Sequence, residues 1–240
     1  MSDLPTAKDA AHILTHLAQA RPGHHQAVQS QGLTPEVALL RTWQTGRLSR
    51  TYNDFLTSQR FRPAALFFLS DLYAPADFSQ RNADLERFYD GLSKALPERA
   101  LVVLAEGIKL HELTERLDAR LAQALVEDLG VTDTITEDQY AEGYRICNNY
   151  DERLHQIRMI DIVGRGVDHM VRLPFVGIAL RLAHTPAHLA GWQELQGFLE
   201  RGFSAFKHMK GADEFLGTIQ SRETRILDRI FAGDPHPFAI

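Results

Sequence analysis

Apolar residues recur along the chain at intervals of three and four positions, which is the spacing of one helix face. The clearest stripe runs through Leu101, Leu104, Ile108, Ala122, Leu125 and Leu129. No stretch alternates between apolar and polar residues in the way that a half-buried strand does. The pattern therefore predicts helices along the whole chain and no sheet.

Local start signals divide this helical chain into elements. Thr34-Pro35 places an N-cap residue before a first-turn proline, and Thr136 with Gln139 forms a capping box. The capping box opens a long helix over residues 137–171, and Pro97 precedes another over residues 98–129. Because about six residues join these long helices, they should be antiparallel neighbours.

The predicted fold is therefore all-α. We expect a single helical-bundle-like domain over residues 1–240, with about eight helices and the two long antiparallel helices at its centre. Helices between residues 6 and 58 are candidates for a peripheral subdomain.

Composition limits the classes of partner. The chain has 240 residues, 44% of them hydrophobic, and a net charge of −5, which is typical of a soluble globular protein. The densest basic group is predicted to be a set of solvated helix faces, so we expect no nucleic-acid partner. This group consists of Arg41, Arg47, Arg50, Arg60 and Arg62.

The compartment follows from what the sequence lacks. The longest apolar run, residues 173–183, is too short for a bilayer and contains Arg181, so we expect no membrane partner. Cys147 is the single cysteine, which excludes an intrachain disulfide, and the first residues do not resemble a signal peptide. These features predict a cytoplasmic protein.

Ionisable residues interrupt the apolar stripe of the first long helix. His111, Glu115 and Asp118 lie on one face, at positions i, i+4 and i+7. If the two long helices are antiparallel about the middle of their connection, these residues face three polar residues of the second helix. Asp118 then faces Asn148, Glu115 faces Asp151, and His111 faces His155.

This constellation predicts a metal site. Two histidines and two carboxylates suit Fe or Mn, and after them Zn. We therefore assign metal binding to His111, Glu115, Asp151 and His155, with Asp118 and Asn148 as cofactor-binding residues at the edge. The corresponding function is a metal-dependent enzyme, such as a non-haem oxidase or oxygenase, acting on a small molecule between the long helices.

Two readings without a metal stay open at this point. The same residues can form a buried ion-paired network or a polar pocket, closed by an arginine such as Arg145, Arg153 or Arg158. The alternative function is a non-catalytic module that binds a small ligand or a partner protein. Its interaction surface would be the aromatic C-terminal third with the tail PHPFAI, and a homodimer is also left open.

Three stretches carry a resemblance to a known family. They are FFLSDLYAPADFSQRNADL (67–85), LHELTERLD (110–118) and LAGWQELQGFLERGFSAFKHM (189–209). Together they resemble an uncharacterised bacterial all-helical family with an FFL-x-D-L-Y motif, a domain of unknown function. The resemblance implies a helical fold from about residue 60 onward, and it implies no catalytic residues.

Overall fold

The computed structural model describes residues 33–74, 98–173, 176–178, 180–181 and 193–239, and every regular element within these ranges is helical. In chain order the elements are α3 (Pro35–Thr51), α4 (Asn53–Thr57), α5 (Arg62–Phe67), η1 (Phe68–Leu72), α7 (Glu98–Gln123), η2 (Ala124–Asp128), α8 (Glu137–Cys147), α9 (Tyr150–Val171), α11 (Gln193–Met209) and α12 (Asp213–Phe231). The π-helical segments η1 and η2 directly continue α5 and α7. The predicted all-α class is confirmed.

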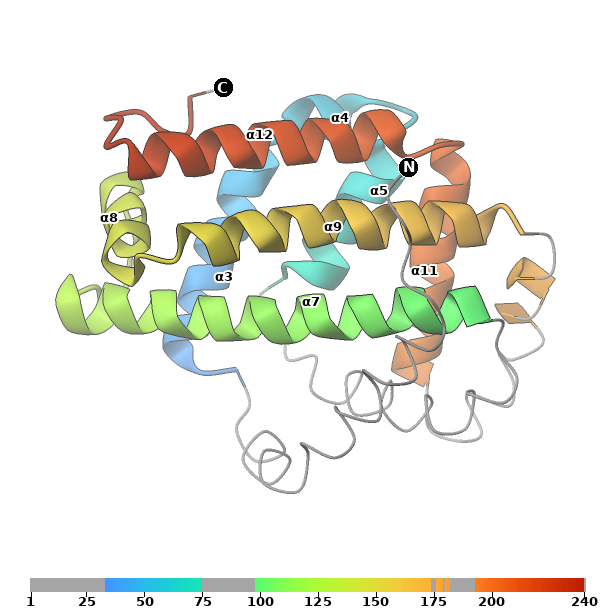
Figure 1. Cartoon of the computed structure of the whole chain (residues 1–240), viewed down its shortest axis with the longest axis horizontal. Coiled ribbons are helices and arrows are strands. Elements are labelled where there is room, and N and C mark those ends of the chain that lie inside the picture. The colour runs from blue at the N-terminus through green and yellow to red at the C-terminus, as the bar shows by residue number, and fades with distance from the viewer. Residues whose placement is uncertain (1–32, 75–97, 174–175, 179, 182–192, 240) are drawn as a thin grey trace, which may run out of the picture.

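The helices form two layers (Figure 1). In the first layer α7, α9 and α12 lie side by side, and the chain reverses direction from each to the next. In the second layer α3, α5 and α11 cross behind these long helices, with α3 packed on α7 and α11 packed on both α5 and α9. The predicted antiparallel pairing of the long helices is confirmed for α7 and α9.

The predicted helix starts are also confirmed. The Thr34 side chain accepts a hydrogen bond from the backbone N–H of Val37, and Pro35 occupies the first helical position of α3. At α8 the Gln139 backbone N–H donates to the Thr136 hydroxyl at 3.2 Å, and the Thr136 backbone N–H donates to the Gln139 side chain at 3.0 Å. Both starts depend on neighbouring residues alone, which makes them readable from sequence.

The predicted continuous helix over residues 137–171 is wrong at its centre. Asn148 has left-handed backbone angles, with φ 47° and ψ 44°, so α8 ends at Cys147 and α9 begins at Tyr150. Asparagine tolerates this conformation better than most residues, because its short polar side chain can bond locally. As a result α8 turns away from the axis of α9 (Figure 1).

The core between the layers is built from two large clusters. One is centred on Phe215, Leu216 and Met209, and the other on Leu40 and Leu121. Helices were predicted along the whole chain, and those expected before residue 33 or within residues 75–97 lie outside the described residues. In the described part of the chain, no helix combines the length and the apolar character that a membrane crossing requires.

Candidate functional site

The structure does not bring the four residues predicted to bind a metal together into a group that could hold an ion. His111 and Glu115 are close, with 3.2 Å between the histidine Nε2 and the carboxylate Oε1, and Arg41 approaches the same oxygen at 3.9 Å. This group lies at the surface, because the Glu115 side chain is 47% exposed. Asp151 and His155 are exposed positions of α9. The expectation that these residues share one buried site is therefore wrong.

The register of the two long helices explains this correction. Thr114 faces Gln156, with 2.8 Å between the threonine hydroxyl and the glutamine nitrogen, and Asp118 faces Arg153. The sequence prediction had placed Asn148 opposite Asp118, which is about one helical turn away. The break at residues 148–149 shifts the pairing, because it separates the connection from the start of α9.

The two predicted cofactor-binding residues differ in burial. Asn148 is exposed in the turn between α8 and α9, whereas Asp118 is buried and belongs to an internal polar network. Among the described residues, no three histidine, cysteine, aspartate or glutamate side chains are grouped as a metal site requires. The metal assignment stays a prediction that this geometry does not support.

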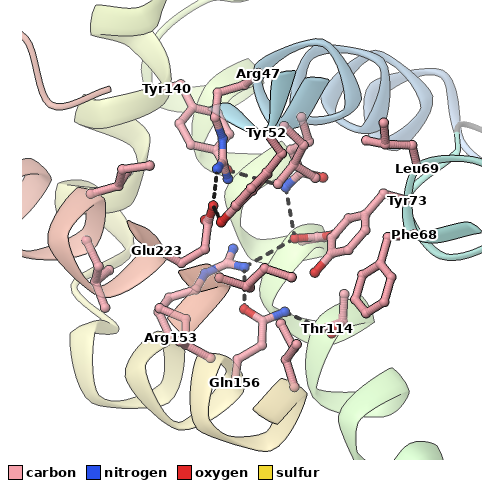
Figure 2. A pocket seen from close by; sticks show the side chains of 18 of the residues that line it. Arg47, Tyr52, Phe68, Leu69, Tyr73, Thr114, Tyr140, Arg153, Gln156 and Glu223 are labelled. Atoms are coloured by element: carbon pink, nitrogen blue, oxygen red, sulfur yellow. Dashed lines mark hydrogen bonds and ion pairs between the residues drawn. The ribbon is translucent and has the colours of Figure 1, made fainter. Parts of the chain in front are cut away.

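A cavity between the two helix layers is the main candidate site (Figure 2). Its volume is about 90 Å³, and residues of α3, α4, α5, η1, α7, α8, α9 and α12 line it. At one end of the cavity lie Arg47, Glu223 and Arg153, and at the other lie Phe68 and Leu69 (Figure 2). The cavity is therefore amphipathic.

The first polar group in the wall joins α3 to α12. The Arg47 guanidinium donates to the Glu223 carboxylate at 2.5 Å, and the Tyr52 hydroxyl donates to the same oxygen at 2.8 Å. Burial acts to lower the pKa of Arg47, but the Glu223 carboxylate, together with Tyr140 and Tyr52, outweighs this effect and raises the pKa above the ordinary value. Arg47 therefore remains charged within the fold.

The second polar group joins α7 to α9. Arg153 donates to the Asp118 carboxylate at 3.3 Å, to the Gln156 side chain at 3.1 Å and to the backbone oxygen of Leu117 at 2.9 Å. Gln44 also donates to Asp118, at 3.3 Å. Of the six residues that the sequence predicted to share a polar site, Asp118 belongs to this network, and Arg153 is one of the arginines named as a possible partner. Glu115, Asn148, Asp151 and His155 are exposed, so the predicted network of all six residues is not formed.

Four tyrosines also line the cavity: Tyr52, Tyr73, Tyr140 and Tyr144. The Tyr140 and Tyr144 hydroxyls are 3.1 Å apart and bond each other. Burial raises the pKa of Tyr52, Tyr73 and Tyr144 above the ordinary value. These phenols are therefore neutral hydrogen-bonding groups at physiological pH.

Tyr73 differs from the other three tyrosines. Its backbone oxygen accepts a hydrogen bond from Thr45 Oγ1 at 2.7 Å, which ties the end of η1 to α3. Its hydroxyl has no hydrogen-bond partner among the described residues. Figure 2 shows the Tyr73 ring pointing into the cavity, across from Tyr52 and Glu223.

Sequence reasoning missed most of this site. Arg47 had been assigned to a solvated face, although it falls on one helical stripe with Leu40, Gln44 and Leu48. That stripe was a usable signal, because Arg47 shares a helix face with two leucines that are covered by the rest of the fold. Glu223 gave no comparable signal, since its partner lies 176 positions away in the chain.

Comparison with known proteins gives one match. A family model described as a domain of unknown function (DUF8198) matches residues 23–237. No curated protein and no solved structure matches the chain. The match covers most of the chain and supports the resemblance inferred from the sequence.

Proposed function

Because the chain belongs to the DUF8198 family, we propose its function from its own geometry: the protein is a module that binds a small molecule in the cavity between its two helix layers. One observation carries this proposal. The cavity places two buried arginine–carboxylate pairs and four tyrosines around an open volume of about 90 Å³.

The cavity and its buried charges lower the stability of the fold, and this supports a role in binding. Protein interiors are packed densely, and a void of this size removes contacts that would stabilise the fold. Buried ion pairs add little stability compared with apolar residues of similar size. In addition, Gln44 Oε1, Arg47 Nε and Arg153 Nε are buried without a hydrogen-bond partner in the described structure, which is unfavourable.

We do not extend the proposal to a metal-dependent oxidase or oxygenase. The four residues predicted to bind the metal lie outside the cavity wall: Glu115, Asp151 and His155 are exposed and His111 is half-buried. The cavity contains the groups that orient a ligand, namely neutral phenols, amides and charge pairs. It therefore favours the non-catalytic alternative.

A cavity-filling variant tests the proposal. Ile219 lines the cavity on α12 and is 8% exposed, so Ile219→Phe should occupy the open volume. We would titrate small alcohols, ketones, amides, carboxylates and amines and follow backbone amide shifts by NMR. The expected result is that at least one compound shifts the cavity residues of the wild type, and that Ile219→Phe abolishes these shifts.

A matched variant controls for the added ring. Ile162→Phe makes the same change on α9 at a position that is 44% exposed, and it should leave binding unchanged. If Ile219→Phe does not fold, Ala65→Leu is the alternative variant, because it fills the cavity from another part of the wall. The proposal is wrong if no compound shifts the cavity residues, or if the compounds bind equally well to the filled variants.

A further inference from the structure

The charge balance of the cavity restricts the ligand, provided that the proposed binding function holds. In the described part of the chain, four charged side chains line the cavity, and they form the pairs Arg47–Glu223 and Arg153–Asp118. All four are buried, with side-chain exposures between 4% and 14%. The wall therefore has a formal charge of zero, and each charged group already has its counter-ion.

An ionised ligand would be unfavourable in such a wall. A carboxylate or ammonium group would lose its hydration on entry, and no unpaired charge in the wall would replace it. An entering charge would also repel one member of each ion pair. A neutral polar group avoids both costs and can still form hydrogen bonds.

Tyr73 provides the hydrogen-bonding group for such a ligand. Tyr52 uses its hydroxyl on Glu223, and Tyr140 and Tyr144 bond each other, so these three phenols are engaged by the protein. The Tyr73 hydroxyl has no hydrogen-bond partner in the described part of the chain, and the Tyr73 ring points into the cavity (Figure 2). A phenol can both donate and accept, which suits an amide, an alcohol or a ketone.

The rest of the wall and the volume set the shape of the ligand. Phe68, Leu69 and Ile160 extend the apolar end, where an alkyl group would replace empty space with contacts. A cavity of ~150 Å³ accommodates benzene. The smaller volume of about 90 Å³ therefore fits a short alkyl chain with one polar group.

We propose that the cavity binds small, uncharged amphipathic molecules, such as short-chain amides, alcohols or ketones, and that Tyr73 is the residue that selects their polar group. The alkyl part of the ligand lies against the aromatic end of the wall. The polar part lies beside the Tyr73 hydroxyl.

Three probes of similar size and different charge test this class. Propionamide is neutral, propionate is an anion and propylammonium is a cation at neutral pH. We would titrate each into the full chain and measure the dissociation constant from amide shifts of the cavity residues. We expect propionamide to bind at least about tenfold more tightly than either ion, because only the ions bring an uncompensated charge.

The outcomes separate the ligand class from the proposed function. If propionate or propylammonium binds as tightly as propionamide, the inferred class is wrong while small-molecule binding stands. If none of the three probes, and none of the wider compound set, shifts the cavity residues, the proposed function itself is wrong.

A tyrosine substitution tests the role of Tyr73 separately. Tyr73→Phe removes only the hydroxyl, and we expect it to weaken propionamide binding about fivefold, the effect of one neutral hydrogen bond. The matched control is Tyr150→Phe, which removes a hydroxyl that bonds Asp228 at 2.7 Å outside the cavity wall. Equal propionamide affinity in Tyr73→Phe and Tyr150→Phe would overturn the assignment of Tyr73.

Discussion

At the scale of single residues, the tyrosines of the cavity wall link protonation to stability. Tyr52, Tyr73 and Tyr144 each have a pKa raised from 10.0, first of all by burial. A raised pKa means that the folded chain holds the phenol proton more tightly than the unfolded chain does. The resulting stabilisation is complete below pH 10 and is lost as the pH rises, because the unfolded tyrosines ionise first.

We therefore expect the free energy of unfolding to decrease above about pH 10. Each buried tyrosine contributes up to about 1.4 kcal/mol per pH unit to this slope. Urea denaturation at several alkaline pH values measures it, and Tyr73→Phe should show a shallower slope than the wild type. Equal slopes in the two proteins would contradict a raised pKa at Tyr73.

Single residues also show where sequence reasoning succeeded and where it stopped. Asp118 was identified as an unusual ionisable residue on an apolar stripe, and it is indeed buried in the cavity wall. The same stripe argument failed for Glu115, which lies at the edge of the helix face and reaches solvent. Position on a helix face predicts burial only when the neighbouring elements that cover the face are known.

At the scale of elements, α9 and α12 approach each other closely at a glycine. A Cβ atom added to Gly164 would lie 2.5 Å from a terminal carbon of Leu216, which is too close. The Leu216 side chain cannot move aside easily, because it is only 1% exposed in the core. Gly164 therefore sets the spacing of the two helices that contribute Arg153 and Glu223 to the cavity.

Alanine substitutions should separate this close contact from helix propensity. We expect Gly164→Ala to lower the free energy of unfolding by about 1–3 kcal/mol through overpacking. Gly217→Ala, within α12 and with nothing near its added Cβ, should raise it by about 1 kcal/mol. Denaturant unfolding of both variants checks the signs, and stabilisation by Gly164→Ala would contradict the contact.

Elements were predictable to the extent that their signals are local. Thr34 and Thr136 marked true helix starts, because a cap depends on residues within the first turn. The break at Asn148 went unrecognised, since the helical pattern of apolar residues resumes on its far side. The residue pairing predicted between α7 and α9 was therefore counted from the wrong connection. The predicted metal site depended on that pairing.

At the scale of the whole molecule, the C-terminal segment packs against the outer side of the cavity's tyrosine wall. The ring of Phe238 contacts Trp43 and Tyr140, with centroid distances of 5.6 Å and 5.9 Å. Trp43 in turn stacks on Tyr140 at 3.9 Å. The tail thus buries apolar surface of α3 and α8 that would otherwise face solvent.

Removal of the Phe238 ring should expose this surface. We expect Phe238→Ala to lower the free energy of unfolding by roughly 1–3 kcal/mol, below the usual cost for a fully buried ring, because Phe238 is half-buried. In a Trp192→Phe background, Trp43 fluorescence should also shift to longer wavelength. His236→Ala, at an exposed tail position, is the control, and an unchanged Trp43 spectrum in Phe238→Ala would contradict the packing.

The whole site was beyond sequence analysis for a topological reason. Its two charge pairs bring together α3 with α12 and α7 with α9, and no periodicity within one helix reports such a pairing. The fold class could be predicted from the helical spacing of apolar residues alone. The cavity could be predicted only from the arrangement of the two helix layers.

The pairing of Arg47 on α3 with Glu223 on α12 also has a consequence for biosynthesis. The helices α3 and α12 must meet before the cavity is complete, so a nascent chain can form the cavity only after α12 has been synthesised. A shortened chain that lacks α12 would keep its other helices, but its cavity would be open on one side. The Arg47 guanidinium would then have no carboxylate partner. If the cavity binds a small molecule as proposed, a chain without α12 should not bind it.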